Sequence, residues 1–381
     1  MGAASLLVVL ALGADHAFAA ASVHAEVRGS APFADGASQG FTPELTLRPT
    51  VGAGWVAGIL RAEVGYQPQL TATGLNVGLL HRLQAGAEWK LSPSRRARVD
   101  QQLTFGQYDT SSLASLGQPG EVSLPDVILP LGTVDYLTSD TAAELDGAIA
   151  PRLRLRGALG YKVSGGLSAS AATLPLEQGP HLTLELSHQA TRRDALSAQL
   201  RLTGDAFSTG TTSGIAEGSA AWRTDLSHQA SLQLSAGAAA VATAGAAAPG
   251  EATPPVVPVA AASLSYGVPR LRLGLEARLA PQPDAQTGRI YERAGAGLSG
   301  EYKPRSDLSV RASGAGSWSV LGDNAGDRTV LGEAQVVYHQ EPVEVEAGVR
   351  FADVVLSKSL ISHATELRGF VGVTFKLATV R

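Results

Sequence analysis

Most of the chain from about Val23 to Leu377 alternates apolar and polar residues with a period of two. In residues 271–279, for example, every second residue is leucine or alanine, and the residues between them are arginine, glycine and glutamate. A period of two places successive side chains on opposite faces of a β-strand. The chain is therefore expected to form many strands with one apolar face and one polar face.

Composition limits the class of protein further. The chain has 381 residues, a formal net charge of -4 and no cysteine, and no shift in composition divides it into separate domains. The arginines are spread among the alternating segments instead of being clustered, so we expect no nucleic-acid partner. The lack of cysteine is compatible with folding in an oxidising compartment without disulfides.

The N-terminus resembles a secretory signal. Residues 5–12 are apolar, and Ala17-Phe18-Ala19 has the small-x-small pattern of a cleavage site, although no Lys or Arg precedes the apolar run. We expect a signal peptide over 1–21, with a short buried N-terminal helix as the alternative. No later window of about 20 apolar residues predicts a transmembrane helix. The candidates are then a secreted soluble β protein and an outer-membrane barrel.

Aromatic residues before short turns favour the barrel. Tyr266, Tyr302 and Tyr338 are 36 residues apart, and each precedes a turn and shares the parity of the apolar face. Such repeated aromatics are typical of the girdle of a membrane barrel at the membrane interface. Core aromatics of a sandwich are the alternative. The predicted interface residues are Trp89, Trp222, Tyr266, Tyr302 and Tyr338.

The alternation and the turns predict an all-β fold, a transmembrane antiparallel up-and-down barrel of about 18 strands, with 16 as the alternative. Residues 22–381 form this single domain. Short turns are expected in the periplasm and longer loops outside. The predicted strands are 22–29, 42–49, 55–66, 74–90, 96–108, 137–149, 152–165, 180–189, 195–206, 214–224, 230–242, 257–267, 270–280, 289–302, 307–319, 329–339, 343–354 and 364–378.

The C-terminal strand carries a motif. Gly372, Phe375 and Leu377 match a Gly-x-x-hydrophobic-x-hydrophobic pattern. Two features depart from the usual form of this pattern: Phe370 stands at a position that is usually polar, and four more residues follow Leu377. With this motif the chain resembles the Gram-negative outer-membrane β-barrels, and in size it resembles polysaccharide-export barrels and porins. The resemblance implies outer-membrane localisation, an insertion signal, and contacts with lipid, with the barrel insertion machinery and with periplasmic export or envelope proteins.

The polar parity places nearly equal numbers of cations and anions inside the barrel. This balance argues against a strongly ion-selective pore and favours a conduit for neutral or mixed-charge solutes. The alternative is that the charges pair and brace the wall. The predicted pore-lining residues are Arg61, Glu63, Arg82, Glu88, Arg154, Arg156, Glu185, Arg201, Glu217, Arg272, Glu276, Arg278, Arg311, Glu344, Glu346, Arg350 and Arg368.

No catalytic residue, metal site or cofactor is predicted. A barrel hydrolase needs a histidine beside a nucleophile and a carboxylate. His188 and His228 stand in a repeated Ser-His-Gln-Ala at short turns, and His181 and His363 lie near long loops without a clear nucleophile. His81 has the apolar parity, which we interpret as a bulge or a misjudged register.

Residues 111–140 form the longest stretch without alternation, and residues 124–131 are strongly apolar. A long loop in a compact fold is usually functional or disordered. We expect this loop to constrict the lumen or to offer a surface to a partner, and a loop lying over the rim is the alternative. The constriction candidates are Leu124, Val127, Ile128, Leu129 and Leu131.

The sequence thus predicts a passive conduit, either a pore or an export channel, for hydrophilic solutes or a glycan chain. A non-conducting structural or docking barrel of an envelope assembly is the second hypothesis. A barrel enzyme is the third.

Overall fold

The computed structural model describes residues 16–34, 37–38, 41–73, 76–109, 133–168, 170, 174–245, 254–284, 287–321, 327–355 and 363–380. The described chain is a single antiparallel sheet of nineteen strands. One of them, β2, has two residues and pairs only with the end of β1, so the wall consists of eighteen long strands. The predicted all-β barrel of about 18 strands is confirmed.

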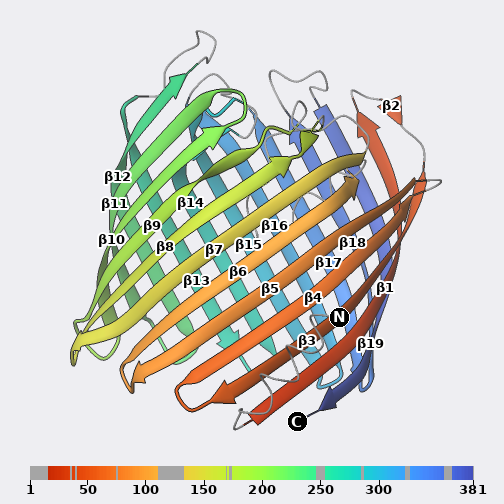
Figure 1. The fold of residues 1–381 in the computed structure, drawn as a ribbon, viewed down its shortest axis with the longest axis horizontal. Helices are drawn as coiled ribbons and strands as arrows, with labels where there is room; N and C mark the ends of the chain where they lie inside the picture. The colour runs from red at the N-terminus through yellow and green to blue at the C-terminus, as the bar shows by residue number, and fades with distance from the viewer. Residues whose placement is uncertain are drawn as a thin grey trace.

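The strands run up and down in chain order (Figure 1). Their bounds are β1 (His16–Ala34), β2 (Ala37–Ser38), β3 (Thr42–Ala57), β4 (Leu60–Thr73), β5 (Asn76–Ser92), β6 (Arg95–Asp109), β7 (Thr133–Ala150), β8 (Leu153–Gly166), β9 (Glu177–Gln189), β10 (Asp194–Phe207), β11 (Thr211–Asp225), β12 (Ala230–Gly245), β13 (Val256–Val268), β14 (Leu271–Pro283), β15 (Ile290–Arg305), β16 (Leu308–Leu321), β17 (Arg328–Gln340), β18 (Val343–Val355) and β19 (His363–Val380).

The first and last strands close the barrel. β1 pairs with β19 from Ala19↔Val380 to Ala34↔Ala364, and on its other side β1 pairs with β3. Figure 1 shows β1 beginning and β19 ending at the end of the barrel where the short turns lie. Closure leaves no unpaired edge among the described long strands, as is required of a sheet surrounded by lipid.

The two faces of the wall carry different side chains. Leu273, Leu275 and Leu298 have exposed fractions of 46%, 54% and 57%, and a belt of equally exposed large apolar side chains surrounds the barrel. Charged side chains of the same strands occupy the opposite face, where they form ion pairs between neighbouring strands. An exposed apolar belt outside and charges inside are the pattern of a barrel that spans a membrane.

None of the described residues forms a helix long and apolar enough to cross a membrane.

One predicted turn is wrong. The Gly-rich residues 50–54 were expected to separate two strands, but they lie inside β3, and the chain reverses at Gly58 and Ile59. Gly58 adopts a φ of 56°, which favours glycine. Gly54 instead serves close packing, because the Phe18 ring of β1 lies where its side chain would be.

His81 is a second correction. The register of β5 with β4 and β6 is regular around it, so there is no bulge at this position. The imidazole stacks between Tyr66 and Phe105, with ring centroids 6.0 Å and 4.9 Å away, and Tyr66 Oη lies 2.7 Å from His81 Nδ1. The apolar parity of His81 is therefore real, because the ring packs as an aromatic residue on the outer face.

β1 begins at His16, within the segment 1–21 that the sequence assigns to a signal peptide.

Candidate functional site

The lumen of the barrel holds the polar side chains and is the candidate functional site. A cavity of about 1490 Å³ is lined by residues of β1, β3 and β12 to β18. Seven cationic and five anionic side chains are among its described lining residues. The predicted pore-lining residues Arg272, Glu276, Arg278, Arg311, Glu346 and Arg350 all line this cavity.

The remaining predicted pore-lining residues lie on the same polar face, around the wall from β4 to β11 and on β18 and β19. Several of them are joined by ion pairs to neighbouring lumen residues. Arg154 Nη2 lies 2.6 Å from Asp146 Oδ2, and Arg156 Nη2 lies 2.8 Å from Glu144 Oε2. Arg61, in contrast, makes only a 3.9 Å contact with Glu63. Arg82, Glu88, Glu185, Arg201 and Glu217 have no ion pair within the described part of the chain.

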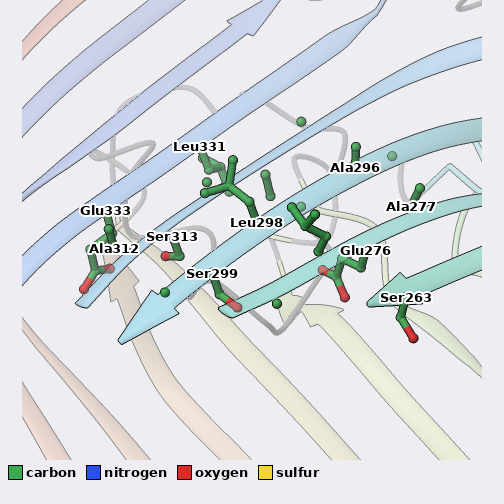
Figure 2. A pocket seen from close by; sticks show the side chains of 18 of the residues that line it. Ser263, Glu276, Ala277, Ala296, Leu298, Ser299, Ala312, Ser313, Leu331 and Glu333 are labelled. Carbon is green, nitrogen blue, oxygen red and sulfur yellow. The ribbon is translucent and has the colours of Figure 1, made fainter. Parts of the chain in front are cut away.

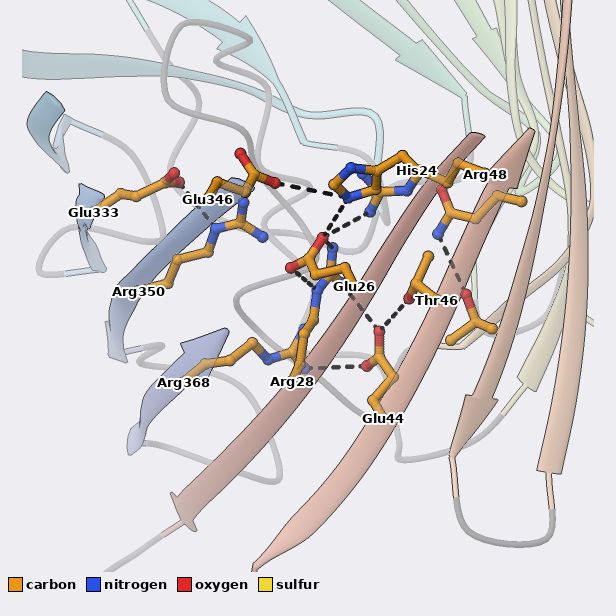
Figure 3. Close-up of polar contacts among 12 residues, drawn as sticks. His24, Glu26, Arg28, Glu44, Thr46, Arg48, Glu333, Glu346, Arg350 and Arg368 are labelled. Carbon is orange, nitrogen blue, oxygen red and sulfur yellow. Dashed lines mark hydrogen bonds and ion pairs between the residues drawn. The ribbon is translucent and has the colours of Figure 1, made fainter. Parts of the chain in front are cut away.

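A buried network occupies the lumen side of the closing strands (Figure 3). Arg28 of β1 donates from Nε and Nη2 to the two oxygens of Glu26, at 2.5 Å and 2.9 Å, and from Nη1 to Glu44 of β3 at 3.0 Å. Arg368 of β19 lies 3.5 Å from Glu44 and 3.3 Å from Glu366. Glu26, Glu366 and Arg368 are at most 1% exposed. Buried charges are tolerated only when they are paired in this way.

His24 extends the network to β18. Its Nε2 lies 3.4 Å from Glu26 Oε2 and 3.6 Å from Glu346 Oε1, and its Nδ1 lies 2.8 Å from the Thr374 hydroxyl. On β18, Arg350 donates to Glu333 at 2.9 Å, and its guanidinium lies 4.5 Å from the centre of the Phe370 ring. Phe370 therefore faces the lumen, where it supports a cation.

Sequence reasoning overlooked His24 and the stacking of Phe370. The signal for His24 was present, because His24, Glu26 and Arg28 share the polar parity of one strand. Their convergence with β3, β18 and β19 depends on closure and register, which local alternation does not encode.

His24, Glu26 and Glu346 could each offer one ligand atom to a metal, since these atoms lie within 4.8 Å of one another. Both Glu26 oxygens, however, already accept hydrogen bonds from Arg28. A divalent cation would have to displace or repel that guanidinium, so we assign the three side chains to the ion-pair network.

The lumen also has an apolar patch toward the long-loop end. Ile215, Ala239, Val257, Val259 and Ala280 are buried together on the inward parity of β11 to β14. Local alternation predicts only polar character for this face, so the patch is a difference from the expected lumen.

Three other histidines lie within ion-pair distance of carboxylates. His363 Nε2 lies 2.7 Å from Asp353 Oδ1, and the Thr365 hydroxyl lies 3.3 Å from the same ring nitrogen. A relay would use opposite ring nitrogens for the carboxylate and the nucleophile. His181 is 4.0 Å from Asp140, and His339 is 2.8 Å from Glu344.

The predicted interface aromatics lie near the short-turn end, and all but the half-buried Trp89 are exposed. Phe375 and Leu377 of the predicted insertion signal are exposed on the outer face of β19, whereas Gly372 faces the lumen. The constriction candidates Leu124, Val127, Ile128, Leu129 and Leu131 lie outside the described residues.

A closed antiparallel barrel of eighteen long strands, with an apolar belt outside and a charged lumen, has the fold of the outer-membrane porins. Solved structures with this fold include OccK9 (OpdG) of Pseudomonas aeruginosa, which is 14% identical with a TM-score of 0.50 and covers 96% of this chain and 100% of its own. OccK2 (OpdF) of the same organism, in complex with glucuronate, is 10% identical with a TM-score of 0.50 and covers 94% of this chain and 98% of its own. No curated protein sequence matches the chain.

The family is shown by a sequence model that matches residues 13–351, which is most of the chain. The protein belongs to the EpsX exopolysaccharide export family.

Proposed function

We propose that the protein is a passive conduit through which a hydrophilic glycan chain leaves the cell across the outer membrane. The observation that carries this proposal is the lumen cavity of about 1490 Å³, whose wall carries seven cationic and five anionic side chains, while the outside of the barrel is apolar. Membership of an exopolysaccharide export family supports a glycan as the solute. An aqueous channel is also expected at this strand number, since barrels of this size leave space inside.

The proposed orientation follows the loop lengths. The short turns, such as Gly58-Ile59 and Pro151-Arg152, would face the periplasm, and the longer connections would face outward. Trp222, Tyr266 and Tyr302 would then lie at the periplasmic interface of the outer membrane, where amphipathic rings are stabilised.

The absence of cysteine allows a direct test of conduction. Ser299 and its neighbour Leu298 both border the cavity, but they have opposite parity on β15, and Leu298 is 57% exposed with its side chain on the outer face. We expect Ser299→Cys channels in planar bilayers to lose most of their current when a bulky, membrane-impermeant thiol reagent is added. Leu298→Cys is the matched control on the same strand and should keep its current.

Open steps that respond at Ser299→Cys and not at Leu298→Cys would support the conduit. A correctly folded barrel that never conducts would instead favour the docking-barrel hypothesis. Release of polysaccharide from cells that carry Ser299→Cys, measured with and without the reagent, would then show whether the glycan uses the same lumen.

A further inference from the structure

The charges of the lumen differ between two parts of the wall. On β1, β3 and β19 the buried cations Arg28 and Arg368 lie against buried carboxylates, as Arg28 does against Glu26 and Glu44. Three cations of β14 to β16 are instead open to the lumen. The side chains of Arg272, Lys303 and Arg311 are 74%, 42% and 42% exposed.

These three cations share a single carboxylate. Arg272 Nη1 lies 3.5 Å from Glu301 Oε2, and Lys303 Nζ and Arg311 Nε lie 3.5 Å and 3.2 Å from Glu301 Oε1. Within the described chain, no second carboxylate is in ion-pair contact with any of the three. The group therefore has two positive charges more than it has negative charges, in contrast to the near-balance of the whole lumen.

The pairing explains why the cations converge. Arg272 is directly opposite Glu301 in the β14–β15 ladder, and Glu301 is directly opposite Arg311 in the β15–β16 ladder. Glu301 thus draws two guanidinium groups toward one point on the wall, while each keeps donors that the carboxylate does not use. A guanidinium has five N–H donors, and its planar fork matches carboxylate, sulfate and phosphate groups.

Polar groups surround this point. Gln335 of β17 is paired with Arg311 in the same row of the sheet. Two residues farther along β15, Ser299 is paired with Ser313 of β16. Gln335, Ser299 and Ser313 all line the cavity. Figure 2 shows Ser299 and Ser313 on the wall of this pocket, with Glu276 and Ser263 farther along it. Hydroxyl and amide groups beside the cations can exchange hydrogen bonds with the hydroxyls of a sugar ring.

Glycines keep the wall open beside the cations. Gly274 follows Arg272 on the inward face of β14, and Gly297 lies beyond Ser299 on β15. A methyl group at Gly274 would lie 2.7 Å from the Ser299 hydroxyl, and one at Gly297 would lie 2.7 Å from Glu276 Oε1. A chain moving along this wall thus meets backbone and small side chains next to exposed positive charge.

We propose that Arg272, Lys303 and Arg311, held around Glu301, form a binding site for the anionic group of an acidic sugar residue within the lumen. The inference rests on the proposed function, because it names the chemical class of the glycan that the conduit accepts. The cations would attract the anionic group from the bulk solution, since a charged, confined wall concentrates counter-ions. The adjacent hydroxyls would bind the sugar ring.

The test compares two double variants with the same change in lumen charge. Arg272→Gln/Arg311→Gln removes two cations of the site. Arg96→Gln/Arg98→Gln is the control on β6, where Arg96 faces Asp146 and Arg98 faces Asp100. The probes are trigalacturonic acid and the neutral trisaccharide maltotriose, and the measurement is the concentration dependence of current blockade in planar bilayers.

We expect the site variant to bind trigalacturonate at least about tenfold more weakly, with maltotriose unchanged, and the control to keep its affinity for both probes. Glu301→Gln should strengthen trigalacturonate binding, since it removes the competing carboxylate. Equal weakening in both double variants would assign the effect to general lumen charge and would overturn the site. Unchanged affinity in the site variant would overturn it as well.

These outcomes are separable from failure of the proposed function. If the channels conduct and admit maltotriose but their trigalacturonate affinity does not depend on Arg272 and Arg311, only the acidic-sugar site fails. If the folded barrel passes no current and no saccharide, the conduit itself fails.

Discussion

His24 on β1 reaches Glu346 on β18 across the intervening strand β19, with 3.6 Å between the imidazole Nε2 and the carboxylate Oε1. Gly372 makes the contact possible. It is the β19 residue paired with both Glu26 and Glu346, and a methyl group there would lie 2.9 Å from Glu346 Oε1 and 2.9 Å from His24 Cε1. The glycine of the C-terminal motif therefore has a structural role on the lumen side, in addition to any role in insertion.

Replacement of Gly372 by alanine should separate His24 from Glu346 and loosen the closing strands. Because the added methyl group would push the ends of the Glu346 and His24 side chains apart, we expect a loss of about 1 kcal/mol in the free energy of unfolding. The measurement is urea unfolding in detergent or lipid vesicles. Gly369→Ala on the same strand is the control, because nothing lies within 4 Å of a methyl group at that position. Equal losses in the two variants would show that the gap at Gly372 is not needed.

Arg28 should be essential to the buried network. Arg28→Met leaves Glu26 and Glu44 buried without their main partner, and removing one member of a buried pair costs about 3–5 kcal/mol. The expected readouts are a lower urea midpoint and loss of heat-resistant migration on gels.

Arg61→Met is the control for Arg28→Met, because the Arg61 side chain is 57% exposed and its contact with Glu63 is 3.9 Å. It should change stability by less than about 1 kcal/mol. If Arg28→Met proved as mild as Arg61→Met, the network would not be what holds β1 to β3.

The two faces of the wall should differ in their tolerance of charge. Leu200→Arg places a cation on the outer face near the middle of β10, where we expect a cost of about 2–4 kcal/mol in lipid. Arg201→Gln, its lumen-facing neighbour, should be much milder. Folding yields and unfolding midpoints in vesicles measure both, and similar costs would contradict the assignment of Leu200 to the lipid face.

The apolar segment around residues 124–131 lies outside the described residues, and its predicted role as a constriction rests on its sequence. Deletion of residues 117–131 should raise single-channel conductance and leave the heat-resistant barrel intact. If the segment is instead a docking surface, conductance should stay the same and a co-purifying partner should be lost. If conductance stayed the same and no partner was lost, a loop lying over the rim would remain as the explanation.

The sequence by itself determined the architecture of this protein. Alternation in segments such as 271–279 identifies the segment as a β-strand and shows which of its side chains face lipid. This works because the face on which a side chain lies depends only on whether its position in the strand is odd or even. Repeated turns predicted the strand number, although the Gly-rich residues 50–54 were misread as a turn. Parity also located the lumen charges, including Arg272 and Arg311.

The tertiary structure decided which of those charges are paired and which are free. His24 meets Glu346, and Glu301 collects Arg272, Lys303 and Arg311, only because closure and register bring particular positions of neighbouring strands to the same level. Residues 24 and 346 are at opposite ends of the chain, and no local pattern encodes their distance. A period of two assigns a side chain to a face, whereas its neighbours on that face are set by hydrogen-bond pairing across strands.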